Sequence, residues 1–206
     1  PVHQYAFQDG VEHALEWTAG LGRMRRISFE ICSAGAERAR PRLKMEVIDE
    51  ILPHALSLVQ RLAPAVQLPK LVWSAAARPD GEYFASAWTD GAIITIAISL
   101  NARPTRFITR IEADRGAIEI DGFHGFATLD RGGASRFSKL AGPFSRSSHT
   151  LGKAAFNLAK RAIQREPAYP GLRDLIRQFY ASACSGVGPP ISSEEIVENV
   201  EAWSNL

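Results

Sequence analysis

A glutamate and a histidine stand four residues apart in an apolar stretch of this 206-residue chain. Between Lys44 and Leu62 apolar residues recur at helical spacing, so Glu50 and His54 are expected to lie side by side, one helical turn apart. A carboxylate beside an imidazole tunes a proton-transfer group near neutral pH. Pro53 removes a backbone donor, so the helix is expected to kink or begin afresh there. The alternative is an ordinary amphipathic helix with a surface pair.

Composition and charge place the chain among globular proteins. Its 24 Lys and Arg stand against 22 Asp and Glu, a formal charge of +2, which argues against nucleic acid or a membrane surface as partner. With only Cys32 and Cys184, a disulfide framework is not expected, and a cytoplasmic, reducing compartment is the default. No apolar run reaches bilayer length, and the start shows no signal-peptide pattern.

The elements around the central helix alternate between helical and strand patterns. We expect an extended lead-in or short strand at 2–7, a helix at 11–18 and a strand at 23–32. One strand is expected over 66–68 and 71–75, interrupted by Pro69, and further strands at 83–88, 92–98, 105–112, 117–120 and 123–129. Asp-Gly steps at 90–91 and 121–122 are hairpin signals. The later strands therefore predict an antiparallel meander, whose polar face is expected to carry Arg106, Thr109 and Glu112.

The last third of the chain is predicted to contain one long loop and three helices. Residues 130–149 are rich in Gly, Ser and Arg, which favours a loop that is solvated or faces an acidic ligand through residues such as Arg136. Helices are expected at 151–164, 172–183 and 193–203. Ser192 and Glu195 have the spacing of a capping box at the start of the last one.

Three stretches of sequence, taken in order, resemble a known family. The meander contains GAIEIDG at 116–122, and the tail contains YPGLRDLIRQFY at 169–180 followed by GPPIS at 188–192. With the acid-x-x-x-His step on the central helix, they resemble the C-terminal domain of the Gfo/Idh/MocA family of NAD(P)-dependent oxidoreductases. The resemblance extends over nearly the whole chain, and it rests on the ordered set of features.

This resemblance implies a single α+β domain, 1–206, with an open, mostly antiparallel sheet packed against helices on one face. It implies a small sugar-like substrate, and NAD or NADP bound mainly by an N-terminal Rossmann domain. It also implies a homo-oligomer formed through the exposed face of the sheet. No G-x-G-x-x-G follows a strand in this sequence, and the family's lysine in a Glu-Lys-Pro step would lie upstream of Pro1.

The resemblance also assigns roles to individual residues. His54 matches the family histidine, which is implied to be the acid/base that exchanges a proton with the substrate hydroxyl or carbonyl. Glu50 stands where the family usually has Asp, and it is the second catalytic candidate. The candidate substrate contacts are His3, Tyr5, His124 and Arg136. No metal ligand or cofactor-binding residue is assigned within this chain.

Two other functions stay open at this point. A non-enzymatic binding or scaffold protein would self-associate through the exposed face of its sheet. A complete catalytic site within the chain would need a Ser/His/Asp arrangement, a metal-ligand cluster or a phosphate loop, and the sequence contains no such constellation. We therefore predict part of an oxidoreductase that is inactive alone, with the binding or scaffold protein as the alternative.

Overall fold

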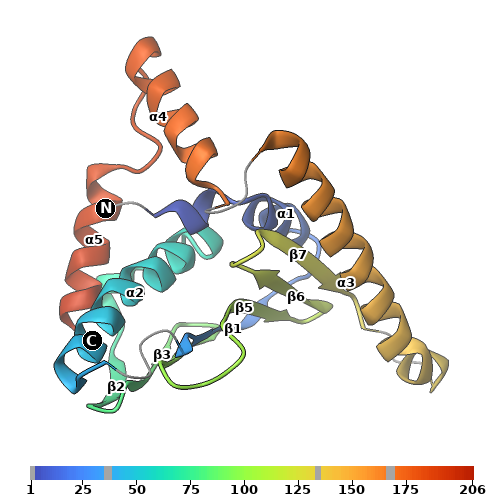
Figure 1. The fold of residues 1–206 in the computed structure, drawn as a ribbon, viewed down its shortest axis with the longest axis horizontal. Helices are drawn as coiled ribbons and strands as arrows, with labels where there is room; N and C mark the ends of the chain where they lie inside the picture. The colour runs from blue at the N-terminus through green and yellow to red at the C-terminus, as the bar shows by residue number, and fades with distance from the viewer. Residues whose placement is uncertain (1–2, 35–38, 133–135, 166–169) are drawn as a thin grey trace.

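The computed structural model describes residues 3–34, 39–132, 136–165 and 170–206, without the side chains of residues 136–141. Within these residues, seven strands form one sheet (Figure 1). The strands are β1 (Met24–Cys32), β2 (Trp73–Arg78), β3 (Glu82–Trp88), β4 (Ile93–Ser99), β5 (Arg106–Ala113), β6 (Gly116–Asp121) and β7 (Phe126–Asp130). The helices are η1 (Gln4–Phe7), α1 (Asp9–Thr18), α2 (Pro41–Leu62), η3 (Leu68–Lys70), α3 (Arg136–Gln164), α4 (Leu172–Ser185) and α5 (Ser193–Ser204).

The first strand of the chain lies at the centre of the sheet. The strand order is β2-β3-β4-β1-β5-β6-β7, and β1 runs parallel to β4 and antiparallel to β5. The other neighbours are antiparallel and follow one another in sequence. The parallel pair is possible because α2 and the β2–β3 hairpin provide the long crossover that it requires. The predicted α+β class with a mostly antiparallel open sheet is confirmed.

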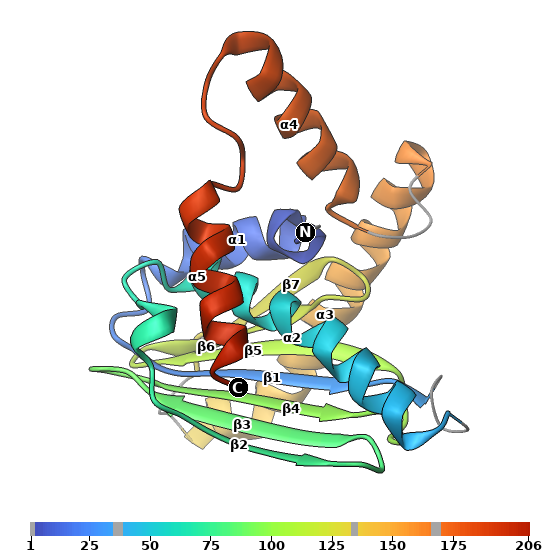
Figure 2. The ribbon, with the colours of Figure 1, turned by 90° about the vertical axis from the view of Figure 1, so that its left-hand side faces the viewer.

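One face of the sheet, called the inner face, is covered by α1, α2 and α5 (Figure 2). Alternate residues of each strand point to this face, such as Ile94 and Ile96, which are fully buried. They meet Ile48 and Leu56 of α2, which are also fully buried. The core therefore lies between the inner face and α2, and the opposite, outer face carries the more polar residues of each strand.

Thr109 lies on the inner face, so its predicted place on the polar face is wrong. It is 2% exposed and pairs with Phe29 and Ile120. Arg106 and Glu112 differ by an even number of positions and share the outer face, whereas position 109 is an odd number from each. The period of a strand thus separates the three residues that the sequence interpretation grouped together.

The central helix α2 runs without a break from Pro41 to Leu62, so a new helix start at Pro53 is wrong. Proline offers no N–H to the turn before it, and the helix is held in place by its neighbours instead. Asn199 of α5 is buried and donates hydrogen bonds from Nδ2 to the Pro53 carbonyl oxygen (3.3 Å) and to Gln60 Oε1 (3.1 Å). These bonds join α5 to the half of α2 that carries His54.

The lead-in at 2–7 forms the 3-10 helix η1 over Gln4–Phe7, so the expected extended strand is wrong there; Val2 lies outside the described residues. The segment packs on α2 and α4, and in the described residues it is not paired with a strand. Ala6 and Phe7 are buried in this packing, and Tyr5 packs against the core. Alternation in so short a segment did not distinguish a strand from one helical turn over a core.

The predicted loop at 130–149 is wrong from Arg136 onward, because α3 begins there and runs to Gln164 with Pro143 inside it. Residues 133–135 lie outside the described part. Apolar residues recur every seven positions from the first half of this helix into the second. The Gly, Ser and Pro residues between them favoured a loop in the sequence analysis. Although α3 has 29 residues, none of the helices in the described residues is apolar enough over sufficient length to cross a bilayer.

The two closing helices agree with the sequence. α4 and α5 lie within two residues of their predicted ends. The capping box is confirmed, because Ser192 Oγ accepts from the Glu195 N–H (3.1 Å) and Glu195 Oε2 accepts from the Ser192 N–H (2.7 Å). This cap fixes the start of α5, the helix that lies along α2.

Gly171 controls how closely the start of α4 approaches the N-terminal segment. Its φ is +86°, and a Cβ built on it would lie 2.3 Å from the Gln4 carbonyl oxygen. Gly186, at the other end of α4, has a similar φ of +69° but nothing within 4 Å of a Cβ. The two glycines therefore share a backbone requirement and differ in steric surroundings.

We expect Gly171→Ala to lower the free energy of unfolding more than Gly186→Ala does. The second change carries the backbone penalty alone, about 1–2 kcal/mol. The first also forces the Gln4 backbone to move, for a total of about 3 kcal/mol or more. Urea unfolding of both variants, followed by circular dichroism, measures the difference. Equal losses would contradict the steric role assigned to Gly171.

Candidate functional site

The imidazole of His54 lies near the middle of α2, beneath the N-terminal segment. Its ring centroid is 5.0 Å from that of Tyr5 and 6.2 Å from that of His3, and both contacts are edge-to-face. The Tyr5 ring in turn lies 4.7 Å from Phe107 of β5. Three of the predicted site residues, from two distant parts of the chain, are thus brought together on the inner-face side of the sheet.

Burial keeps both imidazoles of this group in the neutral form. Desolvation lowers the pKa of His54 below its usual 6.5. It also lowers the pKa of His3 to about 4, with a further lowering from the neighbouring His54 and a small opposite contribution from Glu195. A neutral imidazole has one ring nitrogen free to accept a proton, which is the requirement for a general base at neutral pH.

Each of the two histidines also has a buried nitrogen with no protein partner. In the described part of the chain, Nδ1 of His3 and Nδ1 of His54 make no hydrogen bond. Buried polar atoms are usually paired, because desolvation without a partner costs about 1–3 kcal/mol. Two unpaired ring nitrogens in one cluster are a feature typical of a site that receives a polar ligand.

Glu50 lies on the same helix as His54, but the two side chains are not joined. Glu50 is exposed, and among the described residues no hydrogen bond or ion pair links it to His54. The pKa of His54 is lowered by burial, with no opposing contribution from this carboxylate. The acidic residue that acts on the histidine cluster is Glu195, which raises the pKa of His3.

His124 lies in the turn between β6 and β7, apart from the cluster. Its Nδ1 is 2.7 Å from Asp121 Oδ2, and its side chain is 65% exposed. Within the described residues it makes no ring contact with His54. The side chain of Arg136, the remaining predicted contact, lies outside the described residues.

Gln8 connects the histidine cluster to the rest of the domain, and the sequence analysis did not single it out. It is 1% exposed, and its Nε2 donates to the carbonyl oxygens of Gly122 (2.9 Å) and Pro170 (3.2 Å). One amide thereby holds the N-terminal segment, the β6–β7 turn and the start of α4 together. A lone glutamine before a helix gives no sequence signal for such a role.

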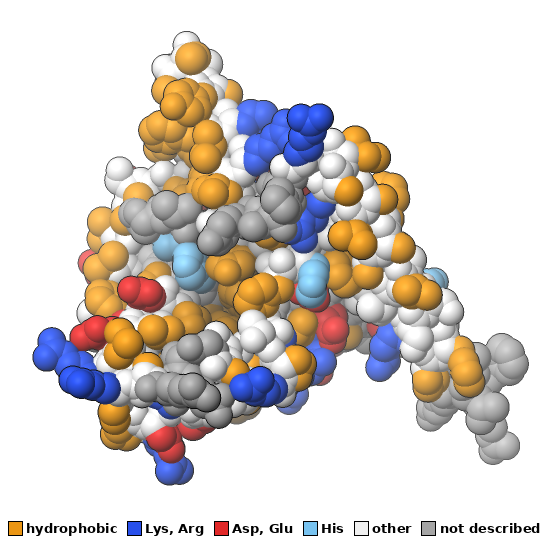
Figure 3. Space-filling view, in the orientation of Figure 1, with side chains coloured by type: hydrophobic (Ala, Val, Ile, Leu, Met, Phe, Trp, Pro, Cys, Tyr) orange, Lys and Arg blue, Asp and Glu red, His pale blue; other side chains and the backbone are white. Residues whose placement is uncertain are grey.

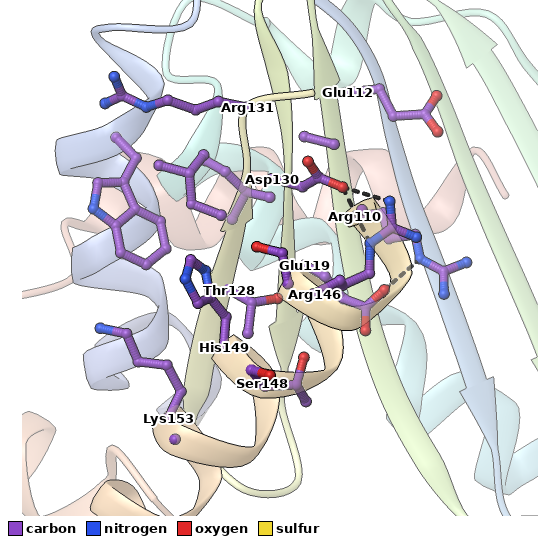
Figure 4. A pocket seen from close by; sticks show the side chains of 18 of the residues that line it. Arg110, Glu112, Glu119, Thr128, Asp130, Arg131, Arg146, Ser148, His149 and Lys153 are labelled. Carbon is purple, nitrogen blue, oxygen red and sulfur yellow. Dashed lines mark hydrogen bonds and ion pairs between the residues drawn. The ribbon is translucent and has the colours of Figure 1, made fainter. Parts of the chain in front are cut away.

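A large cavity lies on the outer face, between α3 and strands β5–β7, and His54 is not among the residues that line it (Figure 4). Its volume is about 1490 Å³, and it is broadly open to solvent. Its charged side chains largely pair with each other: Arg110 Nε donates to Glu119 Oε2 at 2.8 Å, and Arg146 to Asp130. We therefore place the candidate site at the histidine cluster and not in this cavity.

Comparison with known proteins shows the fold. No protein-family profile and no curated sequence matches the chain. Among solved structures, a dehydrogenase (MviM) from Clostridium difficile is similar over 98% of this chain and 59% of its own, with 11% identity and a TM-score of 0.58. An inositol dehydrogenase homolog from Azotobacter vinelandii was solved with NADH and myo-inositol. The similarity extends over 65% of this chain and 40% of the homolog's length, with 14% identity and a TM-score of 0.53.

The chain has the fold of the C-terminal domain of Gfo/Idh/MocA-type dehydrogenases. An oxidoreductase from Pseudomonas syringae is also similar, over 65% of this chain and 39% of its own, at 14% identity and a TM-score of 0.51. The chain spans between 39% and 59% of the lengths of these three proteins. The likeness in fold is therefore to part of each of these proteins.

The described residues do not form a dinucleotide site of the Rossmann kind. Such a site lies where parallel strands of a doubly wound sheet diverge, at a glycine-rich turn before a helix. Here the described strands include a single parallel pair, β1 and β4, and α2 begins with Arg40 and Pro41. These surroundings do not fit a pyrophosphate, so we derive no redox step from this chain's own residues.

The lowered pKa of the buried His3 predicts that the stability of the fold depends on pH. Its pKa is about 4 in the folded chain and about 6.5 when unfolded, so its stabilising effect is complete above pH 6.5 and is lost as the pH falls toward 4. Between pH 7 and pH 5 the free energy of unfolding is expected to fall by about 2 kcal/mol on this account. Urea unfolding of wild type and His3→Gln at both pH values checks this. An equal pH dependence in the two proteins would contradict it.

Proposed function

We propose that this chain is the substrate-binding and oligomerisation domain of an NAD(P)-dependent oxidoreductase, acting on a hydroxyl or carbonyl group of a sugar-like or related small molecule. One observation carries the proposal: the half-buried, neutral imidazole of His54 beside Tyr5 and His3. The dehydrogenase-type fold and the myo-inositol bound by the Azotobacter vinelandii homolog support it.

In this proposal His54 moves the proton of the reaction. Its lowered pKa leaves the imidazole largely deprotonated at pH 7, so it accepts the proton of a substrate hydroxyl during oxidation and returns it to a carbonyl during reduction. Tyr5 and His3 line the same position and orient the substrate. A separate domain holds NAD or NADP, which supplies the redox chemistry when bound. Glu50 keeps a lesser role, since it has no contact with His54.

Replacement of His54 tests the proposed chemistry in a protein that carries both this chain and a cofactor domain. We expect His54→Asn to lower kcat by about 10²–10⁴-fold, because the proton-transfer group is lost while most of the side-chain volume is kept. Steady-state kinetics with NAD or NADP and a panel of polyols and their ketones measures the change.

His13 provides a matched control for that experiment. It is an exposed histidine on α1 that stacks on Trp17, so His13→Asn should change kcat by less than about twofold. Wild-type turnover in His54→Asn would remove His54 from the mechanism. The second candidate function, a non-enzymatic binding or scaffold protein, would be favoured if the longer wild-type protein neither bound a nicotinamide cofactor nor turned over any polyol.

The outer face of the sheet supports self-association in either function. Its β2–β3–β4–β1 part carries a row of short hydroxyl side chains on adjacent strands: Ser74, Ser86, Thr95 and Ser28. Beside this row, Phe84 and Trp88 of β3 are 49% and 75% exposed. Short side chains allow two sheets to approach closely, and the exposed aromatic rings would be buried by a second copy.

A charged substitution in the middle of that row tests self-association. We expect Ser86→Arg to shift the protein from a dimer or larger oligomer toward the monomer, because an unpaired guanidinium would be buried between two sheets. Sedimentation velocity at several concentrations gives the mass. Ser204→Arg, at the exposed end of α5, should leave the mass unchanged. A monomeric wild-type protein would refute the assembly part of the proposal.

A further inference from the structure

Helix α3 carries two stripes of side chains on opposite sides. One stripe is apolar and recurs every seven residues: Phe144, Leu151 and Leu158. The other is basic and recurs at the same interval, two positions later: Arg146, Lys153 and Lys160. Two positions correspond to about 200° around an α-helix, so the two stripes point in nearly opposite directions.

The basic stripe is the one that holds α3 against the domain. Arg146 forms an ion pair with Asp130 at the end of β7, and Lys160 forms one with Asp9 at the start of α1. Lys153, the middle member of the stripe, places its ammonium 5.5 Å from the centroid of the Trp17 ring. The charged side of this amphipathic helix is therefore turned toward the protein.

The apolar stripe is consequently turned away from the protein. Phe144, Leu151 and Leu158 are 78%, 73% and 70% exposed, and Ile163 near the end of the helix is 83% exposed. Figure 3 shows hydrophobic side chains along the part of α3 whose side chains are described. Monomeric proteins rarely expose a continuous row of large apolar side chains unless it contacts a partner or a membrane.

The charge of residues 131–165 indicates whether the apolar stripe contacts another protein or a membrane. Residues 131–165 contain eight lysines and arginines and no acidic residue, and six cations remain once Arg146 and Lys160 are paired with Asp130 and Asp9. The chain's overall charge of +2 hides this local excess. An amphipathic helix with Lys and Arg on one side and Phe and Leu on the other is typical of helices that lie on membrane surfaces. A second copy of α3 would bring two such cationic segments together and repel. An anionic lipid surface would attract each of them.

We propose that α3 lies along an anionic phospholipid surface, with its apolar stripe entering the boundary between headgroups and acyl chains. From Phe144 to Leu158 the stripe is roughly 20 Å long, enough to lie in the plane of the membrane. Exposed cations beside it, such as Arg165, contact the phosphates. The interaction is peripheral, and it is independent of the chemistry proposed for His54.

Co-sedimentation of this chain with vesicles tests the proposal. Wild type is expected to bind vesicles of phosphatidylcholine with about one-third phosphatidylglycerol at least about tenfold more tightly than vesicles of phosphatidylcholine alone. Raising the salt concentration should weaken this binding. Leu151→Glu should lower the affinity for the anionic vesicles about tenfold or more, because it places a charge in the apolar stripe and leaves the basic stripe intact.

Phe179→Glu on α4 is the matched control. Phe179 is 55% exposed on a neighbouring helix, so the change removes an exposed apolar side chain and adds the same charge. Its affinity for vesicles should stay within about twofold of wild type. No binding of wild type to anionic vesicles, or equal binding by Leu151→Glu, would overturn the proposal. Loss of a dimer in Leu151→Glu without vesicle binding would assign the stripe to contacts between copies, and it would also overturn the proposal.

Discussion

The apolar contact between α2 and the inner face of the sheet is the interaction on which the other features depend. Ile48 and Leu56 of α2 are fully buried against the sheet, and each such side chain contributes about 1.5–3 kcal/mol relative to exposure. The contact fixes the rotation of α2 about its axis. This rotation directs His54 toward the N-terminal segment and leaves Glu50 in solvent.

The cluster of His3 and His54 is held at some cost to the stability of the fold. Burial beneath the N-terminal segment holds His3 and His54 neutral, and it leaves a ring nitrogen of each without a partner in the described part of the chain. The unpaired nitrogens cost free energy of folding at any pH, and the suppressed protonation of the two imidazoles adds a cost as the pH falls below about 6.5. They are offset by nearby packing and by the two hydrogen bonds from Gln8. A cluster maintained at such a cost is typical of a functional site, where local rules of stability are relaxed.

Sequence periodicity predicted the elements whose burial pattern is simple. The strands from Trp73 onward, α2, α4 and α5 all show clear alternation or helical spacing, and the capping box at Ser192 was read from two residues. The secondary-structure predictions were wrong where a local sequence pattern was compatible with two different structures. Residues 4–7 alternate but form a turn of 3-10 helix, and the strand expected from 66–68 is wrong because Leu68–Lys70 form η3. Gly, Ser and Pro residues in 136–149 obscured a heptad repeat.

The proximity of His3 and Tyr5 to His54 illustrates a second limit of sequence reasoning. All three were candidates, but their proximity depends on how the N-terminal segment crosses α2, which no local pattern encodes. The spacing of Glu50 and His54 did predict a shared helix. It did not predict that the two side chains stay apart, because an i, i+4 relation permits contact without requiring it.

The central position of β1 has a consequence for how the sheet forms. Strands β2–β3–β4 and β5–β6–β7 are each joined by short connections, whereas β1 pairs with β4 across 67 residues of chain and with β5 across 74 to 89. The two halves share no strand pairing except through β1 in the described residues. Without this strand they would be two separate three-stranded ribbons. The cooperativity of the whole domain therefore depends on its most non-local strand, which precedes the other six strands in the sequence.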